Sequence, residues 1–135
     1  MRDDKYFYPE IEDIFVGYEC ESTNNGEHWY KWEFEQHNFP ALDLEILNNM
    51  YRTQYLTQEQ IENEGWKHVG GKLLSEADQL YEKNNYILSY SYSSKKIVLL
   101  IQDPSKVENY YTEPTFRGTC RCINDFRKII KLLNI

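Results

Sequence analysis

The sequence predicts a single α+β domain over residues 1–135: an antiparallel sheet of two hairpins plus a returning strand, short connecting helices and a C-terminal helix packed on the sheet. Three observations favour this class. Several short runs alternate apolar and polar side chains, as half-buried strands do. Turn-forming residues separate consecutive runs. The final segment repeats apolar side chains at helical spacing.

The first predicted element is an acidic hairpin at about residues 11–37. IFVGYECES (14–22) and HWYKWEFEQ (28–36) both alternate in this way, and TNNGE between them contains an Asn-Gly turn signal. One face of the hairpin would carry an indole and four carboxylates, from Glu19, Glu21, Trp29, Glu33 and Glu35.

An α/β body is expected at about residues 41–135, beginning with two short helices. ALDLEILNNM (41–50) places its large apolar side chains on one helical stripe. In LTQEQIENEGW (56–66), Thr57 has the position of an N-cap and Gln60 can complete a capping box. Ile61 can pack on the residue before the cap as a hydrophobic staple, so this helix is expected to be a corner of the scaffold.

The strands of the body follow. YILSYSY (86–92) and KIVLLIQ (96–102) flank SSK and predict a second hairpin. Because IVLLI is apolar at every position, its strand is expected inside a sheet rather than at an edge. TFRGTCRC (115–122) would return as a strand, whereas SEADQLYEKNN (75–85) is expected to be a weak helix or a loop. The terminal helix NDFRKIIKLLNI would start with Asn124 as its N-cap.

The formal net charge of −7 is unevenly divided along the chain. Residues 1–64 contain 15 acidic and 4 basic residues, a net −11, whereas residues 65–135 contain 7 acidic and 11 basic residues, a net +4. The acidic total argues against a general nucleic-acid or anionic-membrane binder, because such proteins cluster Lys and Arg. The two halves can neutralise each other within the fold or face different partners.

The cysteines do not indicate a disulfide framework, because their number is odd and Cys120 and Cys122 are too close in sequence to pair readily. With Cys20 and a histidine, these residues are of the types that bind zinc. Their C-x-C spacing, however, differs from a zinc knuckle and is typical of inward packing. We therefore expect no metal or other cofactor, and reduced thiols in a cytoplasm.

Sequence motifs for other functions are also missing. The first residues contain no apolar signal region, and no run approaches the roughly 18 apolar residues of a membrane span. We therefore expect neither secretion nor membrane anchoring. There is no phosphate-binding loop, dinucleotide fingerprint, nucleophile elbow or paired-carboxylate motif, so enzyme activity is not expected.

A second candidate site lies near the C-terminus. Tyr110 and Tyr111 occur in a polar loop, and the i, i+4 spacing of Arg117 and Arg121 predicts that both share one strand face. Rings and guanidinium groups can hold a phosphate-bearing nucleotide by stacking and charge. The same arginines can instead pair with the acidic half of the chain.

Three segments resemble small accessory proteins of bacteriophages that infect Bacteroidetes, including crAss-like phages. They are RTQYLTQEQIENEGWK with its LT-x-E-x-I-x-x-x-GW corner, YEKNNYILSYSYSSKKIVLLIQ, and FRGTCRCINDFRKIIKLLNI. The resemblance covers residues 52–135 best and includes only VGYECE of the first hairpin. It implies a phage protein in the cytoplasm of a bacterial host, where binding a host or defence protein is a common task. It transfers no catalytic residue.

These features predict a non-enzymatic protein that binds a host protein through the acidic, aromatic-rich hairpin and modulates or inhibits it. The same acids also suit a hairpin that simply stays soluble. Two alternatives come from other classes of protein. One is a protein that sequesters a nucleotide (a sponge) through the Arg/Tyr cluster of Tyr110, Tyr111, Arg117 and Arg121. The other is a structural virion or assembly protein. A homodimer is compatible with the sequence.

Overall fold

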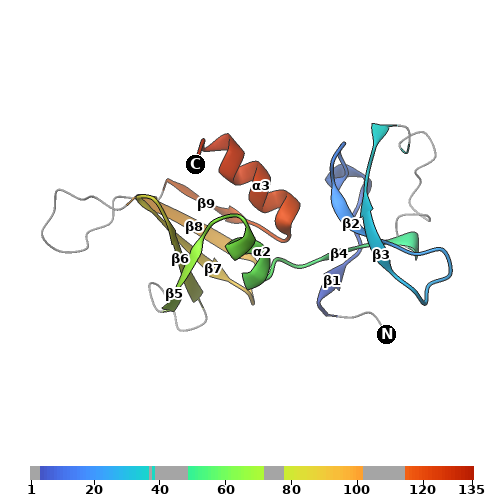
Figure 1. The fold of residues 1–135 in the computed structure, drawn as a ribbon, viewed down its shortest axis with the longest axis horizontal. Helices are drawn as coiled ribbons and strands as arrows, with labels where there is room; N and C mark the ends of the chain where they lie inside the picture. Colours follow the sequence, from blue (N-terminus) through green and yellow to red (C-terminus); the bar gives the residue numbers. More distant parts are fainter. Residues whose placement is uncertain (1–3, 37, 39–48, 72–77, 102–114) are drawn as a thin grey trace, which may run out of the picture. The chain divides into compact units, whose positions relative to one another are not determined.

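The computed structural model describes residues 4–36, 38, 49–71, 78–101 and 115–135 (Figure 1). The chain divides into two compact units. Unit 1 combines Met1–Tyr55 with Cys122–Ile135, and unit 2, Leu56–Arg121, is inserted between these two parts. Each unit contains one antiparallel sheet. The predicted α+β class is confirmed, although the two predicted hairpins belong to separate sheets.

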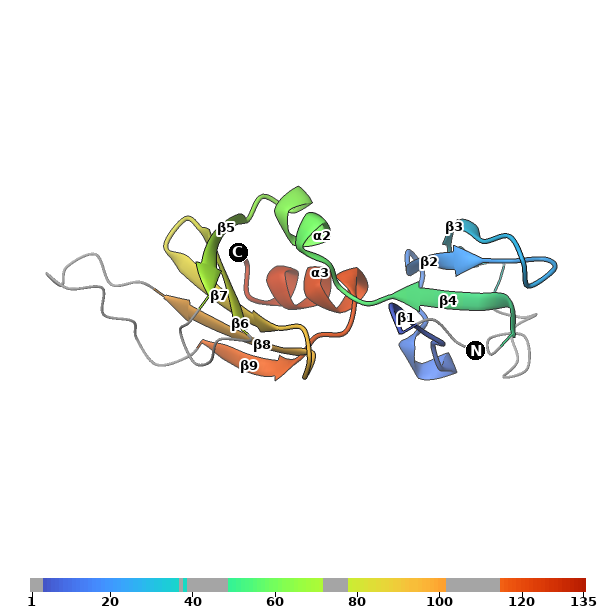
Figure 2. The same ribbon diagram turned by 90° about the horizontal axis from the view of Figure 1, so that it is seen from below.

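Unit 1 contains a four-stranded sheet with the strand order β1-β4-β2-β3 (Figure 2). The acidic hairpin predicted from the sequence is β2-β3, in which Cys20 is opposite Trp32. The other two strands were not predicted from the sequence. The bounds of the four strands are β1 (Tyr6–Phe7), β2 (Glu19–Ser22), β3 (Tyr30–Glu33) and β4 (Tyr51–Gln54).

Strand β2 begins later than the predicted strand at 14–22. A single 3-10 turn, η1 (Ile11–Asp13), precedes it. A reverse turn follows, in which the Tyr18 N–H donates to the Phe15 carbonyl at 3.0 Å. Gly17 has a φ of +94° in this turn, a conformation that glycine adopts without strain. The apolar side chains of this segment therefore reach the core from turns rather than from a strand.

Tyr18 and Phe34 form the buried centre of unit 1. The ring centroid of Phe34 lies 6.4 Å from that of Trp32 and 4.8 Å from that of Tyr51. The Tyr18 hydroxyl is 2.8 Å from Thr53 Oγ1, a hydrogen bond that ties β4 to the hairpin. Burial raises the pKa of Tyr18 well above its usual range, so this hydroxyl stays protonated.

The first turn of the C-terminal helix α3 (Ile123–Leu132) is hydrogen-bonded to β2. Cys122 occupies its N-cap position, so the prediction that Asn124 is the N-cap is wrong. The Asn124 amide instead bonds to β2: Oδ1 accepts from the Glu19 N–H and Nδ2 donates to the Glu19 carbonyl, both at 2.8 Å. β4 pairs with β2 only at Glu21 and Ser22, so it does not bond the backbone of Glu19. The Asn124 amide makes the hydrogen bonds that a neighbouring strand would otherwise make there.

Unit 2 contains a five-stranded sheet with the order β5-β6-β7-β8-β9, so each strand pairs with its neighbours along the chain. β7 and β8 are the predicted second hairpin. β8 lies between β7 and β9, as its continuous apolar run predicts, and β9 is the predicted returning strand. The bounds are β5 (Lys67–Gly71), β6 (Asp78–Lys83), β7 (Tyr86–Ser91), β8 (Lys96–Ile101) and β9 (Phe116–Thr119).

β6 lies where the sequence suggested a weak helix or a loop, so that prediction is wrong for residues 78–83. Asn84 adopts a φ of +56°, which closes a tight turn into β7. Tyr81 is fully buried, and its hydroxyl lies 2.6 Å from that of Tyr92. Tertiary burial of this ring thus outweighs the weak local preference of the segment.

The short helix α2 (Gln58–Asn63) is formed as predicted. Thr57 Oγ1 accepts from the Gln60 N–H at 3.2 Å, and the Thr57 N–H donates to Gln60 Oε1 at 3.1 Å. Ile61 is fully buried.

Most of the helix expected at 41–50 lies outside the described residues. Within the described residues, the structure contains no helix with both the length and the apolar character of a membrane span.

Candidate functional site

The face of the unit 1 sheet opposite the Tyr18–Phe34 core collects most of the residues predicted to bind a partner. Residues opposite each other on paired strands share one face of a sheet. Glu19 is opposite Glu33, while Glu21 is opposite Lys31 in β3 and Arg52 in β4. We refer to the surface made by these residues as the outer face: Glu19, Glu21, Lys31, Glu33 and Arg52.

Arg52 organises one half of the outer face. Its Nε donates to Glu21 Oε1 at 2.8 Å. Its guanidinium carbon lies 3.8 Å from the ring centroid of Tyr6 and 4.3 Å from that of Trp29. Both distances are within the roughly 6 Å range of a cation–π interaction, which contributes about 0.5–1 kcal/mol at exposed sites. The predicted site residues Glu21 and Trp29 are therefore held by one arginine.

The other half of the outer face contains two neighbouring carboxylates. Glu19 and Glu33 are directly opposite each other, an arrangement in which like charges repel. Arg127 of α3 offsets part of this repulsion, because its Nη1 is 2.6 Å from Glu19 Oε2. Glu33 is exposed, and its carboxylate has no ion pair within the described ranges.

Glu35 lies just beyond β3 and is exposed. Its N–H donates to Asn38 Oδ1 at 2.8 Å, and its carbonyl accepts from the Asn38 N–H at 3.0 Å, so the chain turns here. The structure thus groups four of the predicted site residues around β2 and β3. Glu35 lies at the margin of this group.

The alternative Arg/Tyr site is not assembled by the described residues. Tyr110 and Tyr111 lie outside them. Arg117 is exposed in β9, opposite Val98. Because β9 ends at Thr119, Arg121 does not continue the strand face as its i, i+4 spacing predicted.

The three cysteines are free thiols, and Cys120 and Cys122 are buried. Burial raises the pKa of Cys20 to about 12, with the charge of Glu21 as a second cause. Burial also raises the pKa of Cys122. Protonated, buried thiols are poor nucleophiles and poor metal ligands. The described part of the chain contains no group of three or more potential metal-binding side chains.

Sequence reasoning missed three residues at this site: Tyr6, Arg52 and Asn124. β1 has two residues and β4 has four, too few to show a periodic pattern. One available signal was the scarcity of bases, since residues 1–64 contain only 4. A lone arginine such as Arg52 in so acidic a segment is a candidate for pairing within the fold.

The two units also redistribute the charge. Unit 1 contains 13 acidic and 7 basic residues, a net −6, and unit 2 contains 9 acidic and 8 basic residues, a net −1. The contrast of −11 and +4 along the chain becomes smaller because the bases of α3 belong to unit 1, whereas the acids Glu59, Glu62 and Glu64 belong to unit 2. The pair between Arg127 and Glu19 supports neutralisation within the fold as one cause of the uneven sequence.

Comparisons with protein-family models, curated proteins and solved structures give no significant match to this chain.

Proposed function

We propose that this chain is a non-enzymatic binding protein whose outer face contacts a basic surface on a partner protein. The observation that carries the proposal is the stack of Tyr6, Arg52 and Trp29 on Glu21, beside the two carboxylates of Glu19 and Glu33. Trp, Tyr and Arg contribute most of the binding free energy in many protein interfaces. Side chains that are already fixed lose less conformational entropy when a partner binds.

Charge favours a basic partner. Unit 1 has a net charge of −6, and Glu33 adds an exposed carboxylate without an ion pair in the described part of the chain. Complementary charge speeds the encounter of two proteins and disfavours partners of the wrong sign. Together with the resemblance to phage accessory proteins, this favours a partner in the host bacterial cytoplasm, such as an anti-phage defence protein. The chain would modulate or inhibit that protein by covering its basic surface.

A pull-down from host lysate tests the proposal, with Glu33→Lys as the main variant. Reversing Glu33 disturbs no described ion pair, whereas reversing Glu19 would also break its contact with Arg127. Glu27→Lys is the matched control, because it makes the same charge change in the exposed loop at the other end of the hairpin.

We expect the wild type and Glu27→Lys to recover the same basic protein, and Glu33→Lys to lose most of it. Recovery by the wild type should fall as salt is added, because salt screens exposed charges. Recovery by Glu33→Lys that equals that of the wild type would contradict the proposed role of the outer face.

A further inference from the structure

We propose that unit 1 also binds a second copy of this chain, through a patch formed by the η1 turn, the reverse turn at Val16 and the exposed side of α3. We call this surface the self-association patch. It consists of Ile11, Glu12, Val16, Lys131 and Leu132. The proposal does not depend on the outer face or on its partner.

The patch exposes large apolar side chains. Leu132 is 80% exposed, Val16 60% and Ile11 52%. A single exposed apolar residue is common on protein surfaces, but a group of them is typical of an interaction site.

One described contact joins α3 to the reverse turn within unit 1. Lys128 Nζ of α3 lies 4.1 Å from the ring centroid of Phe15, the residue before Val16. Leu132 follows Lys128 by four residues, which on a helix means one turn further along the same face. Ile11 and Val16 are five residues apart, at most about 18 Å. The area that one subunit gives to a standard interface, about 800 Å², is roughly 30 Å across, which is wider than the largest possible separation of Ile11 and Val16.

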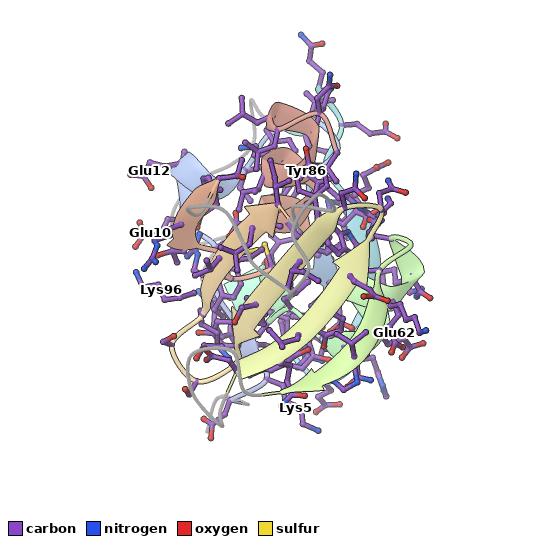
Figure 3. All side chains as sticks on the ribbon, turned by 90° about the vertical axis from the view of Figure 1, so that its left-hand side faces the viewer. Lys5, Glu10, Glu12, Glu62, Tyr86 and Lys96 are labelled. Atoms are coloured by element: carbon purple, nitrogen blue, oxygen red, sulfur yellow. The ribbon has the colours of Figure 1, made fainter. Side chains whose placement is uncertain are left out.

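The charges of the patch are complementary to each other. Glu12 of η1 is exposed and extends away from the ribbon (Figure 3), and Lys131 of α3 is also exposed. Within the described residues, neither side chain has an ion pair. Rotation about a twofold axis brings the same patch of two copies face to face, so that Glu12 of each copy can meet Lys131 of the other. A second copy therefore supplies both the apolar surface and the opposite charges that this patch needs.

The two turns on the acidic side of the patch are held by hydrogen bonds. The Glu10 N–H donates to Asp13 Oδ2 at 2.9 Å, and the Asp13 N–H donates to the Glu10 carbonyl at 3.0 Å. The Gly17 N–H donates to the Phe34 carbonyl at 2.8 Å, which fixes the next turn to the hairpin. Both turns thus present their exposed side chains without further ordering, which lowers the entropic cost of association.

The test measures the mass of the full chain by analytical ultracentrifugation over a range of concentrations, for the wild type, Glu12→Lys, Lys131→Glu and an equimolar mixture of the two variants. Symmetry makes each single variant lose two ion pairs and gain two repulsions, so we expect dimerisation to weaken about tenfold. A mixed dimer contains one Glu12→Lys chain and one Lys131→Glu chain. Its two substituted positions carry opposite charges and can form one ion pair. The unchanged Lys131 of the first chain and the unchanged Glu12 of the second chain form the other. The mixture should therefore regain dimers with one copy of each variant.

Two further variants complete the experiment. Leu132→Ser should weaken the dimer without unfolding the chain, because this side chain makes almost no contact in the single copy. Glu27→Lys should dimerise as the wild type does. A wild-type chain that stays monomeric up to millimolar concentration overturns the proposal. A dimer that survives both charge reversals and Leu132→Ser, or a mixture that stays monomeric, overturns it as well.

Discussion

Among single residues, Asn124 makes two of the hydrogen bonds that join α3 to β2. Its amide satisfies both the N–H and the carbonyl of Glu19, and the residue is buried. Asn124→Ala would leave these two backbone groups without partners, at a cost of about 2–4 kcal/mol in the free energy of unfolding. Asn124→Asp should not rescue the loss, because a carboxylate can accept from the N–H but repels the carbonyl. Urea denaturation measures both variants, and a change below about 0.5 kcal/mol for Asn124→Ala would contradict this role.

The sequence predicts the sheet face on which some side chains lie, but not the partners of those side chains. Glu19 and Glu21 could be assigned to one face, because side chains alternate along a strand with a period of two. The partners of these acids could not be identified, since Arg127 is separated from Glu19 by 108 positions and Arg52 from Glu21 by 31. Such pairs depend on how distant segments fold together.

At the level of elements, α2 is specified by its own sequence. Its capping box has both hydrogen bonds between Thr57 and Gln60. We expect Thr57→Ala to lower the free energy of unfolding by about 1 kcal/mol, because the Gln60 N–H loses its acceptor. Thr57→Ser keeps the hydroxyl and should stay within about 0.5 kcal/mol of the wild type. Equal losses for both substitutions in thermal unfolding would show that the hydroxyl is not the cause.

The predictable elements are the ones with strong local signals. The β2-β3 and β7-β8 hairpins have alternating or continuous apolar strands joined by turn residues, and α2 has its caps. β1 and β4 have no such pattern, and β6 is stabilised by the burial of Tyr81 rather than by local preference. The start of β2 could not be read from alternation either, because turns around Gly17 present their apolar side chains to the same core.

For the whole molecule, we expect the assembly of unit 1 to depend on unit 2, because unit 2 is inserted into its chain. The Leu56 N–H donates to the Arg121 carbonyl at 2.9 Å, so a folded unit 2 holds its own two ends together. That bond shortens the loop between β4 and α3 and lowers the entropy cost of placing α3 on β2. The sequence prediction of one domain then requires that the two units unfold together.

Ile61→Ala tests this coupling, because Ile61 is fully buried in unit 2 and its truncation costs about 2–5 kcal/mol. In a Trp66→Phe background, the remaining tryptophans, Trp29 and Trp32, report on unit 1 alone. The denaturant midpoint of their fluorescence transition should fall, and the midpoint of the transition in far-ultraviolet circular dichroism should fall with it. Val69→Ala, at an exposed position in unit 2, is the control. An unchanged tryptophan midpoint would mean that unit 1 folds independently.

The proposed function depends on contact between the outer face and a basic protein surface. A charge swap tests this most directly, once the pull-down has identified the partner and cross-linking has located the partner's basic residue nearest Glu33. We expect Glu33→Lys to weaken binding in calorimetry, and we expect reversal of that basic residue to Glu in the partner to restore most of the lost affinity. If the two reversals together bind no better than Glu33→Lys alone, Glu33 does not face that residue and the claim is contradicted.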